Sequence, residues 1–280
     1  MTSSGCATTA QFITGAAGPI LLTHYRPTNS TAGPCVLIVP PFAEEMNKSR
    51  RMFALTARAL AAHGIHTVLP DLYGTGDSAG EFSGATIDIW ARDLDATARA
   101  VEQAGERLQG ILALRLGAAL TTEYLARCSA QFVTTVFWQP QAAGAQALSQ
   151  FLRLRVAASM LSAKRASAAE LSAQLQRDGV LEVAGYQLSA ALARGLQGLQ
   201  LSAADLAGRL GDVHCIEIGR RDPLHVSAAL EQVVAQLTAS GVRATAEALL
   251  GDAFWGATEI VTNDVVVATT AQHFAARLIS

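Results

Sequence analysis

The regular alternation of short apolar runs with longer amphipathic stretches constrains the fold of this chain most. Continuous apolar runs stand at residues 35–39, 110–114 and 132–138, as expected for strands that are buried on both faces. Stretches with helical spacing of apolar residues lie at 47–63 and 118–126. Strands and helices that alternate in this way form a parallel sheet with helices on both faces. The sequence therefore predicts an α/β protein.

The rest of the chain extends this pattern at both ends. Two short strands at residues 11–14 and 20–25, joined by a Gly-rich turn, are predicted to form a hairpin. The remaining predicted elements are strands at 66–69, 214–218 and 245–250 and helices at 90–104, 227–239 and 264–278.

One segment, residues 139–211, interrupts the alternation. It is rich in Ala, Ser, Gln and Leu, and it shows helical periodicity with no long strand. A chain of 280 residues can build one large core that carries an inserted cap. We therefore expect one core domain made of residues 1–138 and 212–280, interrupted by a helical cap at 139–211.

Composition argues against several classes of protein. The net charge is −2 and only 16% of residues are charged, so no basic surface for nucleic acid is expected. Residues 1–11 contain no Lys or Arg and no apolar core of a secretory signal. The most apolar stretch, residues 111–120, is short and contains Arg115, so no transmembrane segment is expected. These features predict a cytoplasmic protein.

The cysteines give no sign of a metal site. Cys6, Cys35, Cys128 and Cys215 are scattered without C-x-x-C spacing, and disulfides are not expected in a cytosolic chain. Cys35 and Cys215 lie in apolar strand-like runs and are predicted to be small core residues. No metal and no other cofactor is predicted.

Two loops at the predicted carboxyl edge of the sheet, where open parallel sheets bind ligands, carry informative motifs. Residues 71–80 read DLYGTGDSAG and resemble the D-x-x-G-x-G-x-S stretch that is common in α/β-hydrolases. The strand-turn-helix segment Ala113-Leu-Arg-Leu-Gly117 superimposes on the G-x-S-x-G nucleophile elbow, with Arg115 in place of the serine. The sequence therefore predicts an α/β-hydrolase fold without the usual nucleophile.

Arg115 is unsuited to nucleophilic attack because a guanidinium stays protonated. It offers up to five donors for a carboxylate or phosphate, and the predicted helix N-terminus beside it also favours anions. It could instead pair with a nearby carboxylate and bind nothing. Asp222 stands in the usual place of the triad acid and could hold Arg115, whereas the loop at 251–256, where the triad histidine is expected, contains none.

Other polar residues near this edge supply the remaining candidates. His225 and His273 are interpreted as structural, and the hydroxyls of Ser49 and Ser78 lie off the elbow. Glu45 and Asp222 are the best catalytic candidates, as groups that could polarise a water. The predicted ligand-binding residues are Arg115, Phe42, Glu44, Lys48, Trp138 and Gln139.

Several stretches together resemble one family. They are PPFAEEMNKSRRM at residues 40–52, LRLG at 114–117, WQP at 138–140, QFLRLR at 150–155 and EVAGYQL at 182–188. In combination they look like the second type of exosortase A system-associated hydrolase, and the resemblance spans residues 34–255. It implies a bacterial cytosolic protein encoded with exopolysaccharide and PEP-CTERM sorting machinery, and an arginine at the elbow as a family feature.

Two functional hypotheses follow. The first is a catalytically silent protein that uses an α/β-hydrolase fold to bind a small anionic or sugar-like ligand, or a protein partner of the exopolysaccharide pathway. The second is a hydrolase, esterase or acyltransferase that acts on an ester- or glycan-linked substrate through nonstandard residues. The chemistry of Arg115 favours the first.

Overall fold

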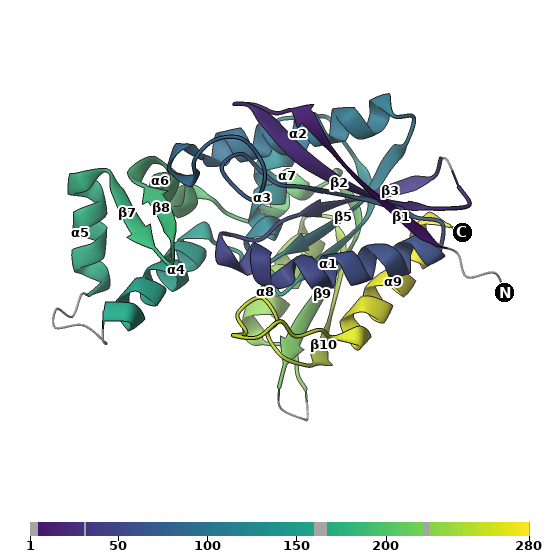
Figure 1. Ribbon diagram of the computed structural model, residues 1–280. Helices are drawn as coiled ribbons and strands as arrows, with labels where there is room; N and C mark the ends of the chain where they lie inside the picture. The colour runs from purple at the N-terminus through teal and green to yellow at the C-terminus, as the bar shows by residue number, and fades with distance from the viewer. Residues whose placement is uncertain (1–4, 31, 160–166, 221–223, 280) are drawn as a thin grey trace.

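A computed structural model describes residues 5–30, 32–159, 167–220 and 224–279, and Figure 1 shows their arrangement. An eight-stranded sheet runs through the centre in the order β1-β2-β4-β3-β5-β6-β9-β10. Its strands are β1 (Cys6–Thr14), β2 (Pro19–Pro27), β3 (Pro34–Val39), β4 (His66–Pro70), β5 (Arg107–Leu114), β6 (Phe132–Trp138), β9 (Leu210–Gly219) and β10 (Arg243–Leu250). The six strands from β4 to β10 in this order are parallel, and β2 is antiparallel to both of its neighbours.

Helices cover both faces of this sheet, as the alternation in the sequence predicts. α1 (Glu44–Ala62) and α9 (Asp264–Leu278) pack together on one face. The opposite face is covered by α2 (Ile87–Gln103), α3 (Leu116–Leu125) and α8 (Ala228–Ala239). Every strand and helix predicted for the core from the sequence is present, most of them one to five residues longer than expected. The chain therefore has the α/β-hydrolase architecture.

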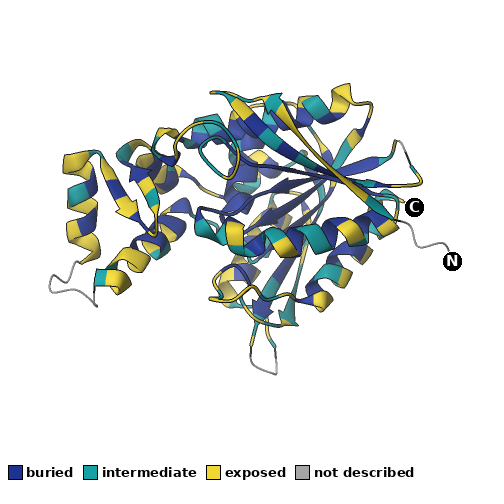
Figure 2. Ribbon diagram, viewed as in Figure 1, coloured by how far each residue is buried: buried dark blue, intermediate teal, exposed yellow. Residues whose placement is uncertain are grey.

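The two core layers explain why the central strands are continuously apolar. Leu37 and Ile111 pack into the layer under α2 and α3, whereas their neighbours Ile38 and Leu112 pack into the layer under α1 and α9. Successive side chains of a strand point to opposite faces, so a strand covered on both sides needs apolar residues at every position. Figure 2 shows these inner strands buried and the edge strand β1 largely exposed.

The segment between β6 and β9 forms a group of elements. It contains α4 (Gly144–Ser159), α5 (Ala168–Asp178), β7 (Val180–Val183), β8 (Tyr186–Ser189), α6 (Ala190–Gly198) and α7 (Ala203–Leu206). We call this group the cap. Of its elements, α4, α5, β7, β8 and α6 lie at the left in Figure 1, whereas α7 lies against α3 and α8 of the core. The helices agree with the expected periodicity, but the β7–β8 hairpin was missed because each strand has only four residues.

The cap is docked onto the core by side chains of its hairpin. The Tyr186 ring packs 5.0 Å from the Phe82 ring, which lies in a short 3-10 turn, η1 (Phe82–Gly84). Asn47 of α1 donates a hydrogen bond to the Tyr186 hydroxyl at 3.0 Å. The cap therefore faces the start of α1, which follows the carboxyl end of β3. Within the described ranges, no helix is both long and apolar enough to cross a membrane.

Candidate functional site

Arg115 occupies a sharp turn between β5 and α3. Its φ of 53° and ψ of −112° lie outside the regions that side-chain-bearing residues prefer. Two residues on, a Cβ on Gly117 would stand 2.5 Å from the Val39 carbonyl oxygen, so only glycine fits there. Such strained turns persist where the surrounding structure fixes them, and they cluster at functional sites. This is the backbone shape of a nucleophile elbow, and it carries an arginine.

The guanidinium of Arg115 is held by three side chains. Its Nε donates a hydrogen bond to Glu45 Oε1 at 2.7 Å, and its Nη2 donates to Gln150 Oε1 on α4. The Trp255 ring stacks against it, with Cζ 5.3 Å from the ring centroid. The carboxylate partner is thus Glu45. Asp222, the partner expected from the sequence, lies outside the described residues.

Glu45 is enclosed in the first turn of α1, and its side chain is 17% exposed. Burial raises the pKa of Glu45 to about 7, although the Arg115 guanidinium acts in the opposite direction. Burial also raises the pKa of Glu44. In the described part of the chain, the Oε2 atoms of Glu44 and Glu45 are buried without a hydrogen-bond partner. Buried acceptors are normally satisfied, so two unpartnered carboxylate oxygens beside one arginine are unusual.

A cavity of about 220 Å³ opens beside this ion pair. Its lining comes from the β3–α1 turn, the elbow, α4 of the cap and the loop between β10 and α9. The lining residues are Phe42, Glu44, Glu45, Lys48, Arg115, Ala147, Gln150, Phe151, Leu154, Trp255 and Gly256. The cavity therefore combines two cations, two carboxyl groups and an apolar wall at the carboxyl end of the sheet.

Comparison with known proteins places the fold in a family. Residues 34–244 match the family described as serine aminopeptidase, S33. The chain belongs to this family. None of the curated proteins compared with this chain matches it.

Several solved esterases and a serine hydrolase share the fold of this S33-family chain. Est1E from Butyrivibrio proteoclasticus, bound to ferulic acid, is 14% identical with a TM-score of 0.71; 97% of this chain and 100% of that chain are covered. An esterase from Pyrobaculum calidifontis is 18% identical with a TM-score of 0.61, covering 96% and 85%. XC6422 from Xanthomonas campestris, a serine hydrolase without lid, is 15% identical with a TM-score of 0.57, covering 98% and 96%. At these identities, the similarity concerns the fold.

This member of the S33 family departs from the serine-hydrolase pattern at two of the three catalytic positions. Arg115 stands where the serine is expected. The loop that follows β10 contains no histidine, and it places Trp255 against the guanidinium instead. Of the described histidines weighed from the sequence, His225 is exposed and His273 contacts Thr134 Oγ1 at 2.9 Å. Neither lines the cavity.

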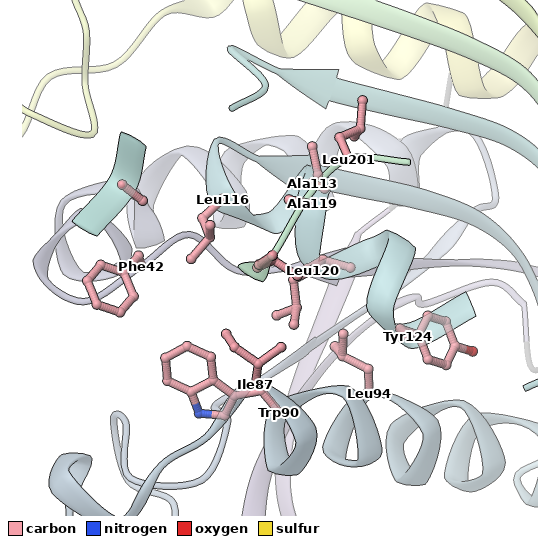
Figure 3. Close-up of a cluster of buried hydrophobic side chains, with 14 of the residues drawn as sticks. Phe42, Ile87, Trp90, Leu94, Ala113, Leu116, Ala119, Leu120, Tyr124 and Leu201 are labelled. Atoms are coloured by element: carbon pink, nitrogen blue, oxygen red, sulfur yellow. The ribbon is translucent and has the colours of Figure 1, made fainter. Parts of the chain in front are cut away.

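Four of the predicted ligand-binding residues line the cavity together with Glu45. They are Phe42, Glu44, Lys48 and Arg115. Phe42 also belongs to the core, because its ring lies 6.1 Å from Trp90, and Figure 3 shows the Phe42 and Leu116 side chains pointing towards that ring. The structure therefore brings these predicted residues together, and their role in ligand binding remains a prediction.

Two of the predicted ligand-binding residues, at the end of β6, lie away from this cavity. The Trp138 side chain is fully buried, stacks 5.7 Å from the Phe53 ring and donates from Nε1 to Thr270 Oγ1 at 2.9 Å. Because of its position in β6, the Trp138 side chain points to the face of the sheet that α1 and α9 cover, and not towards the cavity. Gln139, with a φ of 44°, accepts a hydrogen bond from the Ile218 amide at 2.8 Å and lines a separate hollow. Neither residue lies in the cavity beside Arg115.

Two residues of the site were missed in the sequence. Gln150 was noted only as part of a family-like stretch, and Trp255 only as part of a loop without histidine. Helical spacing placed Gln150 on a cap helix but gave no indication of the elbow beneath it. The hydroxyl of Ser78 serves the fold, since it donates to the Asp71 carbonyl at 2.5 Å and accepts from the Leu21 amide at 2.8 Å. Ser49 is fully buried in α1.

Proposed function

We propose that this chain is a binding protein with an α/β-hydrolase fold that lacks serine-hydrolase activity and takes an anionic or sugar-like ligand. The observation that carries the proposal is the arginine at the elbow, paired with Glu45 at 2.7 Å. A permanently protonated guanidinium provides neither a nucleophile nor a base. On this proposal, the fold offers a cavity at the elbow but lacks the group that would attack a substrate.

The cavity chemistry supports an anionic group on the ligand. Arg115 has five N–H donors, and two of them serve Glu45 and Gln150. The other three make no hydrogen bond within the described residues. Lys48 lines the same cavity, and in the described ranges no carboxylate lies within ion-pair distance of its ammonium. Carboxylates and phosphates are the groups that such donors recognise best.

The rest of the cavity suits a hydroxyl-bearing or partly apolar body. Glu44 and Glu45 line the cavity, where their carboxyl groups would accept hydrogen bonds from hydroxyl groups of a ligand. Phe151, Leu154 and Trp255 offer an apolar wall on which a sugar ring or another flat group packs. A uronic acid or a sugar phosphate combines these properties, and it fits a cavity of about 220 Å³.

The cellular setting rests on the sequence resemblance. The stretches shared with the second type of exosortase A system-associated hydrolase support a role beside exopolysaccharide and protein-sorting machinery in the bacterial cytoplasm. We propose that the ligand is a soluble intermediate or a protein partner of that pathway. Family membership and esterase-like fold are compatible with this setting but do not require it.

A second candidate function is hydrolysis by a nonstandard mechanism, and one observation favours it. Glu45 has a pKa of about 7, which suits a general base at neutral pH. It lines the cavity beside the cation of Arg115, where it could accept a proton from a water that attacks an ester. Asp222 was the other candidate for this role.

Two measurements on purified protein separate these functions. A fluorophosphonate probe and p-nitrophenyl esters report serine and ester chemistry, and we expect no labelling and no turnover. Thermal shift with glucuronate, glucose 6-phosphate and uncharged glucose reports binding, and we expect a rise in Tm with the two anions only.

Variants assign the outcome to the site. Arg115→Ser should abolish the anion-dependent rise in Tm and should stay unlabelled, because no histidine stands in the loop after β10. The matched control is Arg51→Ser, which removes an exposed arginine of α1. Turnover that disappears in Glu45→Gln would establish the hydrolytic function, and labelling of any serine would overturn the proposal.

A further inference from the structure

A second cluster of reactive side chains lies at the opposite end of the sheet from Arg115. His24 is in β2, Cys35 is the second residue of β3, His66 begins β4 and Glu106 immediately precedes β5. These positions meet at the amino ends of the parallel strands. The residues are 3%, 0%, 0% and 4% exposed, so the cluster is closed to solvent.

The donor atoms of three of these residues converge on one point. His24 Nε2, Cys35 Sγ and a carboxylate oxygen of Glu106 all lie within 4.8 Å of one another. His24 Nε2 is 2.8 Å from Glu106 Oε2, and His66 Nδ1 is 3.4 Å from Glu106 Oε1. Arg26, at the rim, donates from Nε to the same Oε1 at 2.9 Å.

The polar atoms of this cluster have few partners outside it. In the described residues, His24 Nε2 and Glu106 Oε2 contact each other, His66 Nδ1 contacts Glu106 Oε1, and His66 Nε2 has no partner. Polar groups that are buried together need partners, and a bound cation is one that engages an imidazole, a thiolate and a carboxylate at once. A cation between His24, Cys35 and Glu106 would engage the ring nitrogen and the carboxylate oxygen at once.

We propose that His24, Cys35 and Glu106 bind one Zn²⁺ ion. Nitrogen, sulfur and oxygen donors in one set suit Zn²⁺, whereas Mg²⁺ and Ca²⁺ prefer oxygen alone. On binding, the Cys35 thiol releases its proton to solvent, and the thiolate and the carboxylate balance the two charges of the ion. His66 and Arg26 contact the other oxygen of Glu106 and orient it, as outer-shell partners of metal ligands do.

The role of this site is structural. The ligands come from β2, from β3 and from the residue before β5, so one ion ties the antiparallel hairpin to the parallel part of the sheet. The site is buried and stands at the end of the sheet opposite to the cavity beside Arg115. Sequence spacing gave no indication of it, and the scattered cysteines predicted no metal, because these ligands lie far apart along the chain.

The test uses the full chain purified without a metal-affinity column. We expect about one zinc per chain by inductively coupled plasma mass spectrometry. Dialysis against a chelator should lower Tm by several degrees, and added ZnCl₂ should restore it. Co²⁺ in place of zinc should give the intense absorption of a thiolate-to-cobalt charge transfer.

Two cysteine variants locate the metal. Cys35→Ser should lose the thiolate-to-cobalt absorption, and Cys215→Ser, which removes an equally buried thiol in β9, should keep it. If Cys35→Ser does not fold, alkylation of the unaltered chain in urea, which opens the buried cluster, gives the same assignment, because Zn²⁺ should slow the reaction of Cys35 more than that of Cys215. A chain that takes up neither ion, or equal absorption in both variants, would overturn the proposal.

Discussion

The two ends of the sheet each bury a carboxylate beside an arginine, yet the pKa of the carboxylate shifts in opposite directions at the two ends. At the carboxyl end, Glu45 receives one hydrogen bond from Arg115, and burial raises its pKa to about 7. At the amino end, burial acts in the same direction on Glu106, but contacts with His24, His66 and Arg26 outweigh it and lower the pKa of Glu106. The number of donors around a buried carboxylate decides whether its charge is stabilised.

This difference separates an adaptable site from a fixed one. Glu45 keeps one oxygen without a partner, lines a cavity and stands beside a strained turn at Arg115. Glu106 is enclosed by strands and has contacts on both oxygens. An enclosed and well-supported group contributes to the fold, whereas a poorly supported group beside a cavity is available to a ligand.

The largest expected effect is the loss of the Glu106 carboxylate. Glu106→Gln leaves the cationic Arg26 and the buried histidines without their anion, so we expect a loss of ~3–5 kcal/mol in the free energy of unfolding. Urea unfolding of the metal-free chain near neutral pH measures it. Glu102→Gln, on the exposed side of α2, is the control and should change little. An equal loss in Glu45→Gln would remove the contrast between the two ends.

A smaller effect is expected from the titration of Glu45. Its pKa is raised in the folded chain, so the folded state holds a proton that the unfolded state releases between pH 4.5 and about 7. The stabilisation is therefore complete at low pH and is lost as pH rises through about 7, by up to ~3 kcal/mol. Urea unfolding across this range should show a slope that Glu45→Gln flattens. An unchanged slope in the variant would assign it to other groups.

Removal of the elbow cation should cost less than removal of Glu106. Arg115→Ser leaves Glu45 without its donor, but Glu45 can take up a proton, which limits the loss in unfolding free energy to about 2 kcal/mol. Chemical unfolding at about pH 7.5, with Arg51→Ser as the control, checks this value. A loss as large as that of Glu106→Gln would mean that Glu45 stays charged, against a pKa of about 7.

The smallest expected effect concerns the affinity of an anion for the cavity. Protonation of Glu45 removes a negative charge beside Arg115, so glucuronate should bind up to about tenfold more tightly at pH 6 than at pH 8. Isothermal titration calorimetry at the two values measures this ratio, and Glu45→Gln should bring it close to one. A ratio that Glu45→Gln leaves untouched would place the anion elsewhere.

Much of the architecture was predictable because it depends on local pattern. The apolar runs at β3, β5 and β6 predicted buried parallel strands, and the β5–turn–α3 segment predicted an elbow with Arg115 at its centre. The hairpin of the cap was missed, since four-residue strands leave too short a pattern. The division of the chain into a core and a cap at residues 139–211 remains a prediction.

The sequence by itself determined the alternation of strands and helices, the replacement of a nucleophile by Arg115 and the lack of a histidine in the loop after β10. Those properties depend on residues that are close together in the sequence. Only the tertiary structure decided that Glu45 pairs with Arg115, that Trp138 turns into the core and that His24, Cys35 and Glu106 meet. Each of these depends on which face of an element a side chain occupies and on contacts between residues that are distant in sequence, and local periodicity does not encode such contacts.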